Sequence, residues 1–147
     1  MMEARDIMGL LPHRYPMLMV DRIVELEPNR RAVGIKNVTI NEPVFTGHYP
    51  GRPIWPGVLV LESMAQVAGL ALMPSDRRAS HSEGDPVPLF TGVDRARFRK
   101  PVVPGDQLRI EATVERVRGG IAKVEAEARV DGELVAEAGL MFAWRDI

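Results

Sequence analysis

The chain of 147 residues contains no cysteine, which excludes a disulfide-stabilised scaffold and catalysis by a thiol. Its formal net charge is only −1, so the protein as a whole has no electrostatic attraction to nucleic acid or to an anionic membrane. The N-terminus is charged where a secretion signal would be apolar. From these absences we expect a soluble, cytoplasmic protein.

Sequence patterns that mark particular chemistries are missing as well. No His-x-x-x-His pattern, cysteine cluster or carboxylate pair at ligand spacing is present, so we expect no metal site. Neither a Gly-x-Ser-x-Gly elbow nor a nucleotide-binding glycine loop occurs. There is no internal repeat, low-complexity tract or linker, and we therefore expect residues 1–147 to form a single domain.

The dominant feature that is present is the apolar run of residues 57–73, which is bounded by Pro56 and Pro74. The run is long and rich in alanine and leucine, which favours a helix over a strand. A helix that is hydrophobic on every side belongs in a protein interior. It is too short for a membrane span and carries Glu62 and Gln66 near its middle. We therefore predict a buried central helix with one isolated carboxyl group.

The segments before and after this helix predict an antiparallel sheet. Beyond residue 107, apolar and polar residues alternate with a period of two, and Asp131-Gly132 is a strong hairpin signal. Most of the inward residues are alanine, which lets the helix approach closely. We predict an α+β fold in which the sheet wraps around the central helix. The other predicted elements are a helix at 3–10, strands at 17–27 and 31–39 joined by a turn at 28–30, an aromatic-rich loop at 41–56, and a mobile polar excursion at 75–88.

Of the three histidines, His48 is the candidate for chemistry. His81 is expected to be solvated surface, and the structural interpretation of His13, a hydrogen-bonded histidine in a proline turn, is favoured over catalysis. His48 lies in a loop that prolines stiffen and that leads directly to the start of the helix at Gly57.

His48 and Glu62 together suit acid–base chemistry. Histidine titrates near neutral pH, and a carboxyl group in an apolar wall should have a raised pKa and hold a proton. The free N–H groups at the helix start could stabilise an oxyanion. This set suits proton abstraction next to a carbonyl, with an acid that assists a leaving group. A Glu–His pair with a purely structural role stays open as the alternative.

Three long motifs resemble one enzyme family. Residues 47–59 (GHYPGRPIWPGVL) and 62–66 (ESMAQ) resemble the signature of the β-hydroxyacyl-[acyl carrier protein] dehydratases of bacterial-type fatty acid synthesis, the FabZ family. Residues 11–22 (LPHRYPMLMVDR) and 97–108 (RFRKPVVPGDQL) resemble the family's first strand and its segment after the helix. The resemblance implies a hot-dog fold and homodimers with active sites at the subunit interface, often assembled as trimers of dimers.

The resemblance also assigns roles to individual residues. His48 matches the catalytic histidine, Glu62 the catalytic carboxylate, and Gly57 the residue whose N–H holds the thioester carbonyl. Val58 and Gln66 are further candidates for binding the oxyanion or the substrate. Tyr49, where Phe is commoner, and the unusually bulky Trp55 affect the shape of the substrate tunnel, for which the candidates are Tyr49, Ile54, Trp55 and Phe98. Glu62 rather than Asp favours the plain dehydratase over the dehydratase/isomerase branch.

The activity implied is that of a hydro-lyase, which converts (3R)-hydroxyacyl-[acyl carrier protein] to the trans-2-enoyl product. No cofactor is expected, because the thioester itself stabilises the enolate-like charge. A hot-dog acyl thioesterase and a non-catalytic module that binds acyl chains or carrier protein are the alternatives. The carrier protein is expected to be acidic and to dock on basic residues that recur with a period of two, although a solvated outer face explains them equally well: Arg95, Arg97, Arg99 and Lys100.

We further expect each active site to be shared, with His48 of one subunit facing Glu62 of the other. This expectation rests on the resemblance and on burial, since a single curved sheet should leave one side of an all-apolar helix uncovered.

Overall fold

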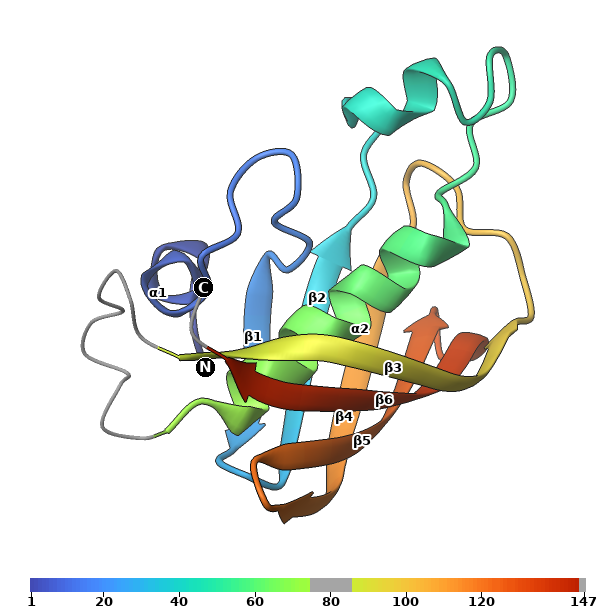
Figure 1. Ribbon diagram of the computed structural model, residues 1–147. Coiled ribbons are helices and arrows are strands. Elements are labelled where there is room, and N and C mark those ends of the chain that lie inside the picture. Colours follow the sequence, from blue (N-terminus) through green and yellow to red (C-terminus); the bar gives the residue numbers. More distant parts are fainter. Residues whose placement is uncertain (75–85, 146–147) are drawn as a thin grey trace.

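The computed structural model describes residues 1–74 and 86–145, in which one curved antiparallel sheet surrounds a long helix (Figure 1). The strands lie in the order β1-β2-β4-β5-β6-β3, and all neighbouring pairs are antiparallel. This confirms the predicted α+β hot-dog fold. In chain order the elements are α1 (Ala4–Leu10), β1 (Arg22–Glu27), β2 (Arg31–Asn37), the 3-10 helix η1 (Pro43–Thr46), α2 (Gly57–Leu72), β3 (Val87–Phe98), β4 (Gln107–Arg118), β5 (Ile121–Val130) and β6 (Glu133–Arg145).

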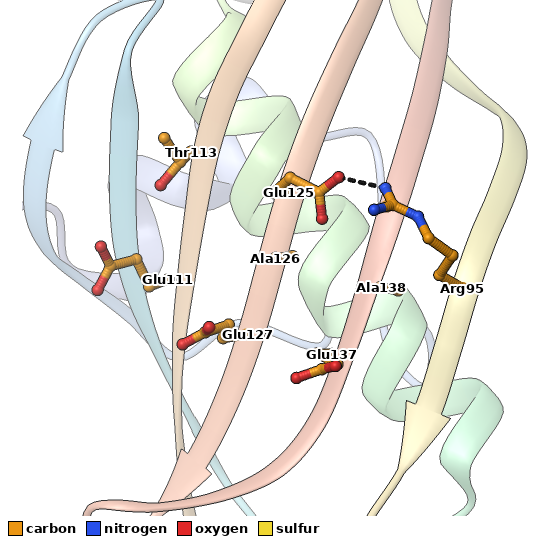
Figure 2. A pocket seen from close by; sticks show the side chains of 9 residues that line it. Arg95, Glu111, Thr113, Glu125, Ala126, Glu127, Glu137 and Ala138 are labelled. Atoms are coloured by element: carbon orange, nitrogen blue, oxygen red, sulfur yellow. Dashed lines mark hydrogen bonds and ion pairs between the residues drawn. The ribbon is translucent and has the colours of Figure 1, made fainter.

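The two faces of the sheet follow the predicted alternation. Ile110, Ala126 and Leu140 are buried on the face that packs against α2. The glutamates that flank Ile110 and Ala126 in sequence, which are Glu111, Glu125 and Glu127, point away from α2, which lies behind the strands in Figure 2. The small inward side chains on β4, β5 and β6 let α2 lie close to the sheet, and all of them are buried: Ala112, Ala122, Ala126, Ala128, Ala136 and Ala138.

Most of α2 is covered within a single chain. Every residue from 63 to 72 is buried, whereas Val58 in the first turn is 70 % exposed. The expectation that a partner must cover the side of the helix that the sheet leaves open is therefore wrong for residues 63–72. The reason is that residues 11–20 pack over the side that the sheet leaves open, with Leu11 and Met19 in the same core as α2. Only the N-terminal part of the helix keeps an apolar surface for a second subunit to cover, at Val58, Leu59 and Leu61.

Several element boundaries differ from the predictions. The predicted strand at 17–27 begins only at Arg22, because the backbone of Met17 and Met19 is hydrogen-bonded to the side chain of Gln66 instead of to a strand. The strand predicted at 31–39 ends at Asn37. The strand β3 starts within the predicted excursion, and Pro88 is tolerated there because β3 is an edge strand. Residues 75–85 of that excursion, with His81, lie outside the described residues.

Candidate active site

His48 lies in a loop whose shape is fixed by backbone hydrogen bonds. Its N–H donates to the carbonyl of Val44 (3.0 Å), and Tyr49 and Arg52 exchange hydrogen bonds of 3.0 and 2.9 Å. The N–H of Trp55 donates to the carbonyl of Val102 at 2.7 Å and ties the end of the loop to the rest of the fold. The loop, teal in Figure 1, therefore lies beyond the end of β2 and delivers the chain to the N-terminal end of α2.

The imidazole of His48 is oriented by one short contact. Its Nδ1 lies 2.7 Å from the carbonyl oxygen of Ile54. Because a carbonyl oxygen can only accept a hydrogen bond, Nδ1 carries the proton and the neutral ring leaves Nε2 as a free base. The ring of Tyr49 stacks on the imidazole with 4.1 Å between ring centroids. His48 is therefore in the tautomer that a general base requires.

A buried ion pair between Lys36 and Glu42 supports the loop that carries His48. Lys36 is 4 % exposed, and its Nζ lies 2.6 Å from Glu42 Oε1 and 5.3 Å from the centroid of the Trp55 ring. Trp55 itself is 2 % exposed and also contacts Phe45, with ring centroids 5.6 Å apart. The pairing compensates for the burial of the two charges, and the indole holds the loop in place.

The N-terminus of α2 presents unpaired backbone donors. Its N-cap, Pro56, has no side chain that could cap the helix, and neither Gly57 nor Val58 has a hydrogen-bond partner for its N–H among the described residues. The ring of Phe98 packs so closely on Gly57 that a Cβ there would lie 2.9 Å from Phe98 Cε1. A thioester oxygen could therefore approach these N–H groups from the cavity beside Phe98.

Glu62 is held by two side chains. Gln66 Nε2 donates to Glu62 Oε1 at 2.7 Å, and His13 Nε2 lies 3.3 Å from the same oxygen. Glu62 Oε2 has no partner among the described residues. These contacts leave one carboxyl oxygen available for a substrate.

The expected raised pKa of Glu62 is not what the structure supports. The pKa of this carboxyl is lowered from its ordinary value, chiefly by the hydrogen bond to His13. Burial raises the pKa, and the bond from Gln66 lowers it further. The prediction failed because it counted the apolar surroundings of Glu62 and missed the donor that comes from a distant part of the chain.

His48 and Glu62 lie in two different cavities of the chain. A cavity of about 450 Å³ contains His48, Gly57 and Val58. A second cavity, of about 310 Å³, contains Glu62 and His13 among mainly apolar residues such as Leu89, Phe90 and Phe142. A single chain therefore does not bring the two predicted catalytic residues together.

The four tunnel candidates all line the cavity of His48, but they differ in exposure. Tyr49 and Phe98 are 51 % and 52 % exposed, and Ile54 is half-buried, whereas Trp55 lines the cavity from a buried position. Gln66 lines the other cavity, and its side-chain amide is already engaged in hydrogen bonds within the chain. It accepts a hydrogen bond from Met19 N–H (2.8 Å) and donates to Met17 O (2.7 Å) and to Glu62, so it supports the carboxyl group.

The basic residues proposed for docking do not form one regular strand face. Arg95 has a left-handed backbone (φ 52°) at an irregularity between Asp94 and Arg97, and β3 ends before Arg99. Three of the four cations are paired with glutamates across the sheet: Arg95 with Glu125, Arg99 with Glu137, and Lys100 with Glu133. Arg97 has no ion pair among the described residues.

A hollow of about 410 Å³ on the outer face of the sheet is not a candidate for the site. Figure 2 shows that Glu111, Glu125, Glu127 and Glu137 line it, with Arg95 bonded to Glu125. Each of these glutamates is already paired with an arginine, and neither His48 nor Glu62 lines the hollow. Within residues 1–74 and 86–145, no group of three or more His, Cys, Asp or Glu side chains could hold a metal ion. No helix in the same part of the chain is long and apolar enough to cross a membrane.

His13 is the residue that sequence reasoning missed. The sequence favours a structural role for it, yet the structure places its imidazole at the proposed catalytic carboxyl. The only signal in the sequence is its position in the first of the three family-like motifs, ahead of the strand. Nothing local could indicate that residues 13 and 62 meet.

The sequence of this chain is similar to those of characterised families. A family model described as a FabA-like domain matches residues 11–139. A "3-hydroxyacyl-[acyl-carrier-protein] dehydratase FabZ" from Syntrophotalea carbinolica is 57 % identical over 141 residues, which cover 95 % of this chain and 92 % of the relative. The protein of the same name from Desulforamulus reducens is 54 % identical over 143 residues, 97 % of each chain.

The fold is also found in a solved structure of low sequence identity. The dehydratase heterocomplex ApeI:P from Xenorhabdus doucetiae contains a chain that superimposes with a TM-score of 0.76 at 16 % identity. The superposition covers 95 % of this chain and 90 % of that one. At this identity the likeness supports the fold alone.

Proposed function

The chain belongs to the FabZ family of 3-hydroxyacyl-[acyl-carrier-protein] dehydratases, and we propose that His48 and Glu62 are the acid–base pair with which it works. The protein is a hydro-lyase that dehydrates 3-hydroxyacyl-[acyl carrier protein] in fatty acid synthesis. Family membership decides against the thioesterase and the non-catalytic binding module. The observation that carries the residue assignment is that each side chain is held through one atom, which leaves His48 Nε2 and Glu62 Oε2 for the substrate.

In the first step the thioester is positioned and activated. The carbonyl oxygen of the (3R)-hydroxyacyl group accepts hydrogen bonds at the start of α2, from the N–H of Gly57 with help from Val58. These donors stabilise negative charge on the oxygen and so acidify the α-carbon. The acyl chain lies in the apolar cavity beside Glu62, whose lining suits hydrocarbon.

In the second step the C–H bond at the α-carbon and the C–O bond at the β-carbon are broken. His48 Nε2 takes the α-proton, and the electron pair forms the double bond of the trans-2-enoyl product. The hydroxyl group leaves with a proton from Glu62, delivered directly or through a water molecule. Water is the second product.

The lowered pKa of Glu62 in the free chain requires a source for this proton. We propose that Glu62 takes it up when the acyl chain fills the cavity. Removal of the remaining solvent disfavours the carboxylate and raises its pKa. After turnover the proton on His48 returns to Glu62, so no net proton is consumed.

We also propose that the site is completed by a second copy of the chain in a homodimer, as the separate cavities of His48 and Glu62 suggest. The exposed apolar first turn of α2 and the outer edge of β3, which pairs with no further strand among the described residues, are surfaces that a second copy could cover. Assembly into trimers of such dimers is a further part of the proposal.

The residue assignment is tested by measuring the conjugated enoyl absorbance from a 3-hydroxyacyl thioester. His48→Ala or Glu62→Gln should lower kcat by about 10²- to 10⁴-fold, as expected for loss of a positioned acid or base. Circular dichroism should show the fold unchanged. A folded variant with nearly wild-type turnover would refute the role of that residue.

A further inference from the structure

We propose that His13 is a positioning residue for the dehydration, which holds the carboxyl group of Glu62 in its working orientation and controls its proton. This inference rests on the proposed role of Glu62. It assigns to the loop before β1 a part in the reaction that neither His48 nor Gln66 can supply.

The first argument is the geometry at Glu62. His13 Nε2, 3.3 Å from Glu62 Oε1, approaches the same oxygen that Gln66 Nε2 contacts at 2.7 Å. Two groups on one oxygen fix the plane of the carboxyl and leave Oε2 for the substrate. With the hydrogen bond from Gln66 alone, the carboxyl group of Glu62 could rotate about that bond, whereas two contacts from different elements restrict the rotation.

The second argument is that the backbone around His13 is held in place independently of Glu62. The guanidinium of Arg14 donates to the carbonyls of Met8 (2.9 Å), Leu11 (2.9 Å) and His13 (2.7 Å). The N–H of Met17 donates back to Arg14 O at 2.7 Å. His13 is therefore presented by a rigid turn, as a group that orients another must be.

The third argument is a nitrogen that a purely structural histidine would not leave unpaired. His13 Nδ1 is buried and has no hydrogen-bond partner among the described residues. Buried polar atoms are normally satisfied, and exceptions occur where a side chain serves a function. Because a carboxylate oxygen only accepts, the contact places a proton on Nε2, and the unpaired Nδ1 is the consequence of that arrangement.

The fourth argument is that few other groups can control the proton on Glu62. His13 and Glu62 are the only titratable side chains of the described residues that line this cavity. From α2 comes the neutral Gln66, and from β3 and β6 come apolar side chains such as Phe90 and Phe142. The charge of Arg14 is directed to backbone carbonyls, and the remaining charge would be His48 of a second copy. The hydrogen bond from His13 lowers the pKa of Glu62, so its loss should raise that pKa.

The experiment compares two amide variants that differ by one methylene. His13→Gln can place a donor near the position of Nε2, whereas His13→Asn is too short to reach Glu62. The side chain is 32 % exposed, so both polar amides should be tolerated, and thermal unfolding checks that they are. We expect His13→Gln to keep kcat within about threefold, and His13→Asn to lose about 10- to 100-fold, because misplacement of a catalytic group by about 1 Å can cost that much. KM should change little in either variant.

A second measurement follows Glu62 directly. The ¹³C signal of its carboxyl group, assigned by its loss in Glu62→Gln, is titrated in protein labelled with ¹³C-glutamate. The pKa of Glu62 should be higher in His13→Asn than in the wild type, with His13→Gln in between. Equal kcat and equal Glu62 titration in the two amide variants would overturn the proposal, as would an ordinary or raised pKa in the wild-type protein. Nearly wild-type activity of Glu62→Gln would instead overturn the proposed function.

Discussion

At the scale of single residues, arginines that look equivalent in the sequence differ in whether they form an ion pair. Arg95, Arg97 and Arg99 recur at every second position, yet only Arg97 forms no direct ion pair among the described residues. It lies opposite Glu137 in the register of β3 and β6, but Glu137 is bonded to Arg99. An arginine paired across the sheet must give up or share its partner before it can bind an acidic carrier protein. Arg97 is therefore the member of the group best suited to contact one.

Arg97→Glu should raise KM for the carrier-bound substrate by roughly fivefold, equivalent to about 1 kcal/mol, and leave a small thioester analogue unaffected. Arg95→Glu is the matched control, since it changes the same charge at a residue that is bonded to Glu125. Steady-state kinetics at two salt concentrations would measure both. If both variants affect both substrates to the same extent, the basic residues form a solvated face and no docking site.

At the scale of elements, β2 and α2 touch where β2 has no side chain. A Cβ on Gly34 would lie 2.6 Å from Val67 Cγ2 and 3.2 Å from Ile23 Cδ1. Val67 and Ile23 are fully buried, so neither can move aside without disturbing the core around α2. The glycine thus sets the distance between the helix that carries Glu62 and the sheet.

Gly34→Ala should destabilise the protein by about 1–3 kcal/mol, the usual cost of overpacking a core. Urea unfolding measures this as a lower midpoint at an unchanged m-value. The control is Gly92→Ala in β3, where the new Cβ would meet Met141 Cβ at an ordinary 3.7 Å. Equal stability of the two variants would show that β2 and α2 can separate without cost.

At the scale of the whole molecule, the proposed base His48 and the proposed acid Glu62 lie in separate cavities of one chain. A dimer with shared sites would join the cavity of His48 in one copy to that of Glu62 in the other. Its subunits would then complement each other: each mixed dimer of His48→Ala and Glu62→Ala chains contains one intact site and one doubly damaged site.

The two inactive variants should therefore regain activity when they are unfolded together and refolded. Random pairing makes half of the dimers mixed with one working site each, which gives about a quarter of wild-type activity by symmetry. Each variant refolded alone is the control, and mass spectrometry of differently labelled chains establishes subunit exchange. Exchange without recovered activity would show that each chain supplies its own catalytic pair.

The sequence by itself determined the elements and the candidate residues. The apolar run from residue 57 predicted α2, and the period of two predicted β4 to β6, because both patterns are local consequences of backbone geometry. His48 and Glu62 could be selected from their neighbours in sequence, a stiff loop and an apolar helix. The boundaries of β1 and β3 could not, since they depend on which distant groups take the backbone hydrogen bonds.

Only the tertiary structure decided how these residues are surrounded. Gln66 reaches Met17 and Met19 across more than 45 positions, and His13 reaches Glu62 from nearly 50 positions away. These contacts reverse the expected direction of the pKa of Glu62 and cover the helix within one chain. A local sequence pattern shows which face of an element is apolar. Which donor lies next to a carboxyl group depends on the tertiary fold, and the pKa of that carboxyl group depends on the distance between the two.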